Sequence, residues 1–139
     1  MAKYNLFLDD IRDPSACLNY KTKFMPENRR AYSSDDWVIV RSYSEFAETI
    51  KTKFASGEFP GLVSFDHELA DIHYNPELFQ ELFEYHEETG ADCANFIVHF
   101  CLENELNLPE FYVHSANPLG AQRIYDNMQD YFRYKERSK

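Results

Sequence analysis

The segment YNLFLDD, at residues 4–10, decides how the rest of the chain is interpreted. Four of its first five residues are apolar or aromatic, and the run then changes abruptly to two aspartates. A short apolar run bounded by polar residues is typical of a strand that is buried on both faces of a sheet. We therefore expect a buried strand here, with Asp9 and Asp10 at its carboxyl end.

Three later segments repeat this change from apolar to polar residues. They are WVIV at 37–40, LVSF at 62–65 and FYV at 111–113, which precede Arg41-Ser42, Asp66-His67 and His114-Ser115 in that order. In a parallel sheet the carboxyl ends of the strands share one edge, and ligands bind there at the point where the strand order reverses. The polar pairs are therefore the candidates for a functional site.

Apolar residues at helical spacing follow or separate these strands. We expect helices that begin near Ser44, Pro76, Asp92 and Asn117, with Gly57 and Pro60 ending the first and Gly90 ending the second. Residues 11–36 carry little periodicity and predict a long irregular crossover. The pattern alternates strands with helices along most of the chain.

This alternation predicts an α/β fold, a three-layer sandwich with helices on both faces of a mainly parallel sheet. Right-handed crossovers favour the strand order 2-1-3-4, with four strands or with a fifth edge strand drawn from residues 15–36. We expect one domain over residues 1–139, in which residues 70–89 form an acidic helical insertion.

Composition narrows the classes of function. The chain has 139 residues, of which 44% are hydrophobic, and this composition predicts a globular domain. Its net charge of −10 predicts that long nucleic acids and anionic membranes repel it. No apolar run approaches the roughly 20 residues of a membrane helix. The three cysteines fit no zinc spacing, which favours reduced thiols and a cytoplasmic location.

Three aspartates are the candidate metal ligands. In a 2-1-3-4 sheet the strand order reverses between the first and third strands, which brings Asp9, Asp10 and Asp66 together. Carboxylates this close repel one another, so either one stays protonated or a divalent cation binds, with Mg²⁺ favoured and Mn²⁺ as the alternative. The competing interpretation is that Asp10 or Asp66 only caps the turn that follows it.

Two arginines at the same edge are candidate phosphate ligands. Arg12 follows the acidic pair and Arg41 ends the neighbouring strand. The planar guanidinium group matches the geometry of phosphate oxygens. For Arg12, an ion pair with Asp10 or Asp13 explains the residue as well as a phosphate contact does. For Arg41, at the end of a strand, a role in the pocket is the favoured interpretation.

His67 and His114 are candidate general acids or bases, because the pKa of histidine lies near neutrality. The alternative is that backbone groups satisfy both rings. Ser115 and the helix that begins near Asn117 predict a phosphate site, although capping alone explains Asn117. Asp92 is interpreted mainly as a helix cap, with a pocket contact as the alternative.

Five sequence blocks, in this order, resemble a known family. They are LDDIRDP at 8–14, VRS at 40–42, SFDHEL at 64–69, TGADCA at 89–94 and HSANPLG at 114–120. The chain is similar to the cyclic-phosphate processing receiver-like domain family, a derivative of the flavodoxin-like response-regulator receiver. The resemblance implies that Asp9 and Asp10 match the receiver's Mg²⁺-binding pair, Asp66 its phosphoacceptor and Ser115 its hydroxyl residue.

The sequence and the resemblance together leave three functions open. The first is metal-assisted hydrolysis of a cyclic phosphate on a nucleotide or an RNA end, with Asp66, His67 and His114 as catalytic residues. The second is a module that binds a nucleotide or a protein partner without catalysis. The third is a signalling receiver phosphorylated on Asp66; a missing lysine after a fifth strand and the two added histidines count against it.

Overall fold

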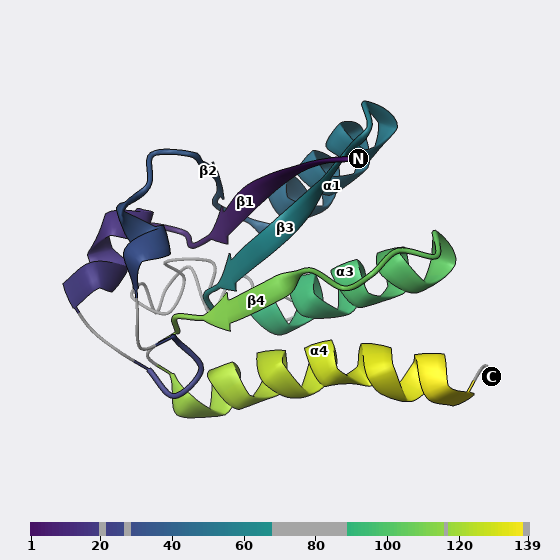
Figure 1. Ribbon diagram of the computed structural model, residues 1–139. Coiled ribbons are helices and arrows are strands. Elements are labelled where there is room, and N and C mark those ends of the chain that lie inside the picture. Colours follow the sequence, from purple (N-terminus) through teal and green to yellow (C-terminus); the bar gives the residue numbers. More distant parts are fainter. Residues whose placement is uncertain (20–21, 27–28, 68–88, 116, 138–139) are drawn as a thin grey trace, which may run out of the picture.

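The computed structural model describes residues 1–19, 22–26, 29–67, 89–115 and 117–137 (Figure 1). The strands are β1 (Ala2–Leu8), β2 (Trp37–Val40), β3 (Glu58–Phe65) and β4 (Glu110–Val113). The helices are α1 (Tyr43–Ala55), α3 (Gly90–Glu103) and α4 (Pro118–Arg137), with the short 3-10 helices η1 (Pro14–Asn19) and η2 (Arg30–Ser33). No helix in these ranges is both long and apolar enough to cross a membrane.

All strand pairs are parallel, and the sheet order is β2-β1-β3-β4. The predicted order 2-1-3-4 is therefore confirmed. In register, Leu8 lies opposite Val40 and Phe65, and Phe65 lies opposite Val113. The four strands therefore end at the same edge of the sheet, and the first polar residue after each strand lies at that edge.

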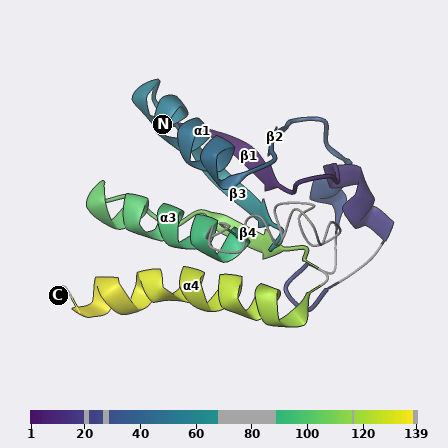
Figure 2. The ribbon, with the colours of Figure 1, turned by 180° about the vertical axis from the view of Figure 1, so that it is seen from behind.

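The sheet separates two hydrophobic cores. Leu6 and Leu8 point into the core shared with α1, α3 and α4, whereas Phe7 points into a smaller core on the opposite face. The three α-helices cover one face, as the two views show (Figures 1 and 2). On the other face lie the short helices η1 and η2, which contribute Cys17 and Tyr32 to the second core, so helices lie on both faces as expected.

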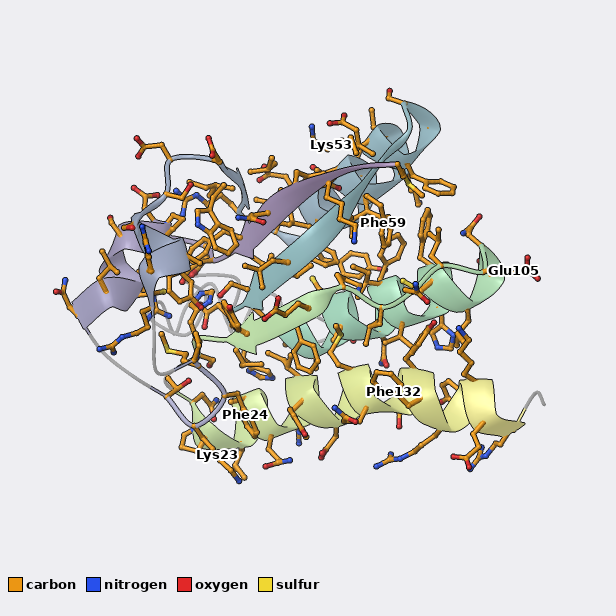
Figure 3. All side chains as sticks on the ribbon, viewed as in Figure 1. Lys23, Phe24, Lys53, Phe59, Glu105 and Phe132 are labelled. Atoms are coloured by element: carbon orange, nitrogen blue, oxygen red, sulfur yellow. The ribbon has the colours of Figure 1, made fainter. Side chains whose placement is uncertain are left out.

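The predicted fifth strand is absent from the described part of residues 15–36. Residues 22–25 nevertheless cover the outer edge of β4: the Thr22 hydroxyl donates to the Val113 carbonyl at 2.6 Å, and the Val113 amide donates to the Phe24 carbonyl at 3.2 Å. The Phe24 ring stacks on Tyr125 at 4.6 Å, against the first turns of α4 (Figure 3). These contacts satisfy an edge that would otherwise be open to another strand.

Helix α1 begins earlier than expected. Ser42, not Ser44, is the N-cap, because its extended backbone lets its hydroxyl accept from the Glu45 amide at 3.2 Å. Gly57 follows the helix with a φ of 86°, a conformation that glycine adopts without strain. Pro60 lies within β3, where the register to β1 shifts, instead of ending the helix.

Helix α3 also begins earlier, at Gly90, with Thr89 as its N-cap. Asp92 is the third helical residue and accepts from the Thr89 amide at 2.7 Å, so the predicted cap is part of a capping box. A Cβ on Gly90 would lie 1.8 Å from the Asp66 carbonyl oxygen, so only glycine permits this contact. The acidic insertion predicted at 70–89 falls, apart from Thr89, outside the described residues.

Gly90→Ala should destabilise the fold by about 3 kcal/mol, because its methyl group meets a backbone oxygen that cannot move without distorting β3. Urea unfolding of the two proteins measures the loss. Gly61→Ala is the matched control, since its Cβ would meet only the flexible Lys3 side chain, at 3.1 Å. Equal stability of the Gly90→Ala protein and the native protein would contradict the close packing of α3 on β3.

Candidate functional site

The Asp9 carboxylate lies at the centre of the carboxyl edge and is completely buried. Its Oδ1 accepts from the amides of Ile11 and Arg12, at 3.0 and 2.8 Å. Its Oδ2 accepts from Arg12 Nε at 2.9 Å and hydrogen bonds to His114 Nε2 at 3.1 Å. Burial alone would raise the pKa of Asp9, but the hydrogen bonds from His114 and the two amides outweigh it, so the pKa lies well below its usual range.

Arg12 connects this carboxylate to a second one. While its Nε binds Asp9, its Nη2 lies 3.3 Å from Asp66 Oδ1. The Arg12 side chain is 31% exposed, whereas the two carboxylates are almost completely buried. The guanidinium group therefore lies at the solvent side of the pocket and compensates the charge of both aspartates.

Asp66 follows β3 and is 5% exposed. Its amide donates to the Leu8 carbonyl, and its Oδ1 accepts from the His67 amide at 2.9 Å. Burial, and next the negative charge of Asp9, raise the pKa of Asp66 to about 7, although Arg12 opposes the shift. The charge of Asp10 raises it further, which indicates that all three predicted acidic residues act on one pocket.

His114, the first residue after β4, is fully buried beside Asp9. Phe7 stacks on its ring at 4.5 Å with an angle of 6°, and its Nδ1 hydrogen bonds to the Ser64 hydroxyl at 2.7 Å. Burial lowers the pKa of His114, and the hydrogen bond to Asp9 only partly restores it. Both ring nitrogens thus bind side chains, not the backbone groups considered as the alternative.

Three of these residues are close enough together to hold a metal ion. One donor atom from each of Asp9, Asp66 and His114 lies within 4.8 Å of the others. The sequence predicted the two aspartates as ligands but assigned His114 to catalysis. A cation among these atoms would replace the charge compensation that Arg12 provides.

Three further predicted residues make contacts at the start of α4. The His67 ring packs on Gly120, where a Cβ would lie 2.3 Å from the ring, so α4 begins directly against it. The buried Ser115 hydroxyl accepts from the Asn117 amide at 3.2 Å. Asn117 caps α4, because its Oδ1 accepts from the amides of Leu119 and Gly120, both at 3.1 Å. Capping therefore explains Asn117; its predicted phosphate contact stays a prediction.

Arg41 holds the loop that follows β1. Its guanidinium group donates to the carbonyls of Asp9 and Arg12 and to the Asp13 carboxylate. These bonds connect the end of β2 to residues 9–13 and so fix the turn in which Asp9 receives its amide donors. Its predicted phosphate contact stays a prediction.

Two residues that bond to the site, Ser64 and Tyr32, were not predicted from the sequence. The Ser64 hydroxyl bonds to His114 and also to the Tyr32 hydroxyl, at 2.7 Å in each case. Ser64 is the one polar residue in the apolar run LVSF, which was an available signal. Tyr32 lies in a segment without periodicity, so the sequence contained no signal that pointed to it.

The comparison with protein families agrees with this geometry. The family model of the cyclic-phosphate processing receiver domain matches residues 4–130. The chain belongs to this family. No curated protein and no solved structure matches it. The matched range includes every site residue from Asp9 to Asn117, and the receiver-like parallel sheet is the one observed.

The raised pKa of Asp66 predicts a pH-dependent stability. The folded protein holds a proton on Asp66 up to about pH 7 that the unfolded chain loses near 3.8, so the contribution of Asp66 to stability should fall as pH rises between these values, whereas the lowered pKa of His114 contributes an opposite slope below 6.5. The slope approaches about 1.4 kcal/mol per pH unit. Urea unfolding with a chelator present, across this range, measures it.

Asp66→Asn should remove that part of the slope, because the amide does not titrate. Asp126→Asn, an exposed change on α4, should leave the slope as in the native protein. An unchanged slope in the Asp66→Asn protein would show that another group causes it.

Proposed function

We propose that the protein hydrolyses a cyclic phosphate on a small nucleotide or an RNA end, with a divalent cation at Asp9, Asp10 and Asp66. The observation that carries this proposal is the position of Arg12, whose guanidinium group bridges Asp9 and Asp66 at the edge of the sheet. Asp9 and Asp66 would hold a divalent cation, which would supply the positive charge that Arg12 provides to both carboxylates. The family description, cyclic-phosphate processing, supports the same class of substrate.

The donor set fits a hard cation. The oxygens of Asp9 and Asp66 belong to the set of donor atoms that lie within 4.8 Å of one another, and the raised pKa of Asp66 reflects negative charge that Arg12 compensates only in part. Carboxylate oxygens suit Mg²⁺ best and Mn²⁺ next. When bound, such an ion polarises a phosphate oxygen and lowers the pKa of a water molecule.

Arg12 then has a second role in the proposal. Displaced from the carboxylates, its guanidinium group can bind two non-bridging oxygens of the substrate phosphate. The Ser115 hydroxyl, which accepts from the Asn117 amide and can still donate its own hydrogen, adds a hydrogen-bond donor near the start of α4. Arg41, whose bonds fix residues 9–13, holds Arg12 in place and presents a further positive charge.

The reaction needs one water and one proton transfer. The water oxygen forms a bond to phosphorus, one ring P–O bond breaks, and the proton that the water loses reaches the departing alkoxide oxygen. A buried histidine beside the carboxylates suits this transfer, and the two candidates are His67 and His114. The product is a phosphate monoester.

Charge and cysteine chemistry support a small substrate in a reducing compartment. The net charge of −10 disfavours a long nucleic-acid surface, so a nucleotide or a strand end is the better match. All three cysteines are buried thiols, which agrees with a cytoplasmic protein.

Phosphorus NMR tests the activity. Incubation with Mg²⁺ or Mn²⁺ and 2′,3′-cyclic, 3′,5′-cyclic or linear nucleotides should show ring opening of a cyclic substrate only. Asp66→Asn should abolish turnover, because it removes a charged ligand, whereas Asp126→Asn on the exposed face of α4 should retain it. Binding without ring opening by the native protein would instead favour a nucleotide-binding module.

Arg12→Gln should tighten binding of Mg²⁺ on the order of tenfold, because it removes a positive charge that competes for the same carboxylates. Isothermal calorimetry without substrate measures this affinity. Arg133→Gln is the control, since that arginine pairs with Asp130 on the surface of α4. Weaker Mg²⁺ binding by Arg12→Gln would contradict competition between Arg12 and the ion.

A further inference from the structure

A chain of buried hydrogen bonds runs along the sheet face that carries Phe7 and ends at Asp9. The Tyr32 hydroxyl bonds to the Ser64 hydroxyl, Ser64 bonds to His114 Nδ1, and His114 Nε2 bonds to Asp9 Oδ2. The distances are 2.7, 2.7 and 3.1 Å. The side chains come from η2, from β3 and from the ends of β4 and β1, and all four are buried. The proposed reaction uses only the last two of them.

The two ends of this series of hydrogen bonds determine which atom donates in each bond. An ionised Asp9 can only accept, so His114 Nε2 carries a hydrogen and donates it. The other nitrogen of a neutral ring then accepts, which makes Ser64 its donor and Tyr32 the donor to Ser64. In this direction every hydroxyl hydrogen has an acceptor. In the reverse direction the Tyr32 hydrogen would find none among the hydrogen bonds of the described residues.

Aromatic packing holds the chain rigid. The Tyr32 ring stacks on Trp37 at 5.7 Å with an angle of 9°, and Trp37 Nε1 donates to the Ala31 carbonyl at 2.9 Å. At the other end, Phe7 stacks on the His114 ring. His114 is thus constrained in its plane and at both nitrogens, so the ring cannot turn to offer a different atom to the pocket.

We propose that Tyr32 and Ser64 are positioning residues that keep His114 protonated on Nε2, so that His114 orients the Asp9 carboxylate and stays outside the coordination shell of the metal. The part that concerns the metal rests on the proposed function. Removal of an imidazole from the donor set leaves oxygen ligands only, which favour Mg²⁺ and Mn²⁺ over Zn²⁺. The transfer of a proton to the leaving oxygen then falls to His67.

Nitrogen NMR of the histidine rings tests the first part in metal-free protein. His114→Gln assigns the His114 signals among those of the five histidines. The native protein should show a protonated Nε2 and an unprotonated Nδ1 that accepts a hydrogen bond. Ser64→Ala should move the Nδ1 resonance toward that of an unbonded lone pair. A ring protonated on Nδ1, alone or together with Nε2, would overturn the proposal.

Calorimetry with Mg²⁺ and with Zn²⁺ tests the second part. Tyr32→Phe keeps the stacked ring but removes the terminal donor, so Ser64 can accept from Nδ1 and Nε2 can bind a metal. The affinity for Zn²⁺ relative to Mg²⁺ should rise about tenfold, a usual effect of a residue behind a ligand. Tyr112→Phe is the matched control: this ring lies 5.9 Å from Tyr32, but its hydroxyl bonds to Glu110. Thermal unfolding confirms that both variants fold.

The outcomes separate this proposal from the proposed function. An unchanged ratio of affinities in Tyr32→Phe, or loss of the Nε2 hydrogen when Mg²⁺ is added to the native protein, would overturn it. If neither ion binds the native protein, the metal site of the proposed function fails and the part about coordination fails with it. The ring-nitrogen spectrum still decides the protonation of His114 in that case.

Discussion

A carboxylate completely withdrawn from water is the constraint on which this structure depends. An ionised carboxylate in a protein interior costs several kcal/mol unless donors replace its hydration. Asp9 receives them from two amides of the turn after β1, from Arg12 and from His114. Each donor in turn requires a particular local structure. Arg41 must hold the turn, and β4 must end in register with β1 so that His114 reaches the same carboxylate.

The second carboxylate has no equivalent set of donors. Asp66 accepts from one amide and shares Arg12 with Asp9, and its pKa rises to about 7 because burial and repulsion dominate. A buried carboxyl group with a raised pKa, at the carboxyl edge of a parallel sheet, is typical of a functional site. The fold also brings one helix to Asp66 and another to the residue after it: Gly90 lets α3 approach the Asp66 carbonyl, and Gly120 lets α4 approach the His67 ring.

The sequence predicted the elements that depend on local pattern. Apolar runs that end in polar residues located all four strand ends, and the strand order then placed Asp9 beside Asp66. Helix starts were less accurate: a local bond to Ser42 starts α1 two residues before the predicted cap, and Gly90, predicted to end a helix, is the residue at which α3 approaches β3. The layer opposite the α-helices was expected, but its elements η1 and η2 were not located, since they lack a periodic pattern. The hydrogen bonds that join Tyr32, Ser64 and His114 connect residues far apart in the chain, and no spacing in the sequence records them.

The central claim is that one position between Asp9 and Asp66 takes either the Arg12 guanidinium group or a divalent cation. An anomalous difference map from crystals soaked in Mn²⁺ tests it most directly. We predict one strong peak within coordination distance of an oxygen from each carboxylate, with the Arg12 side chain turned away toward solvent. Arg12 still bridging the two carboxylates at saturating Mn²⁺, with any peak elsewhere, would contradict the account.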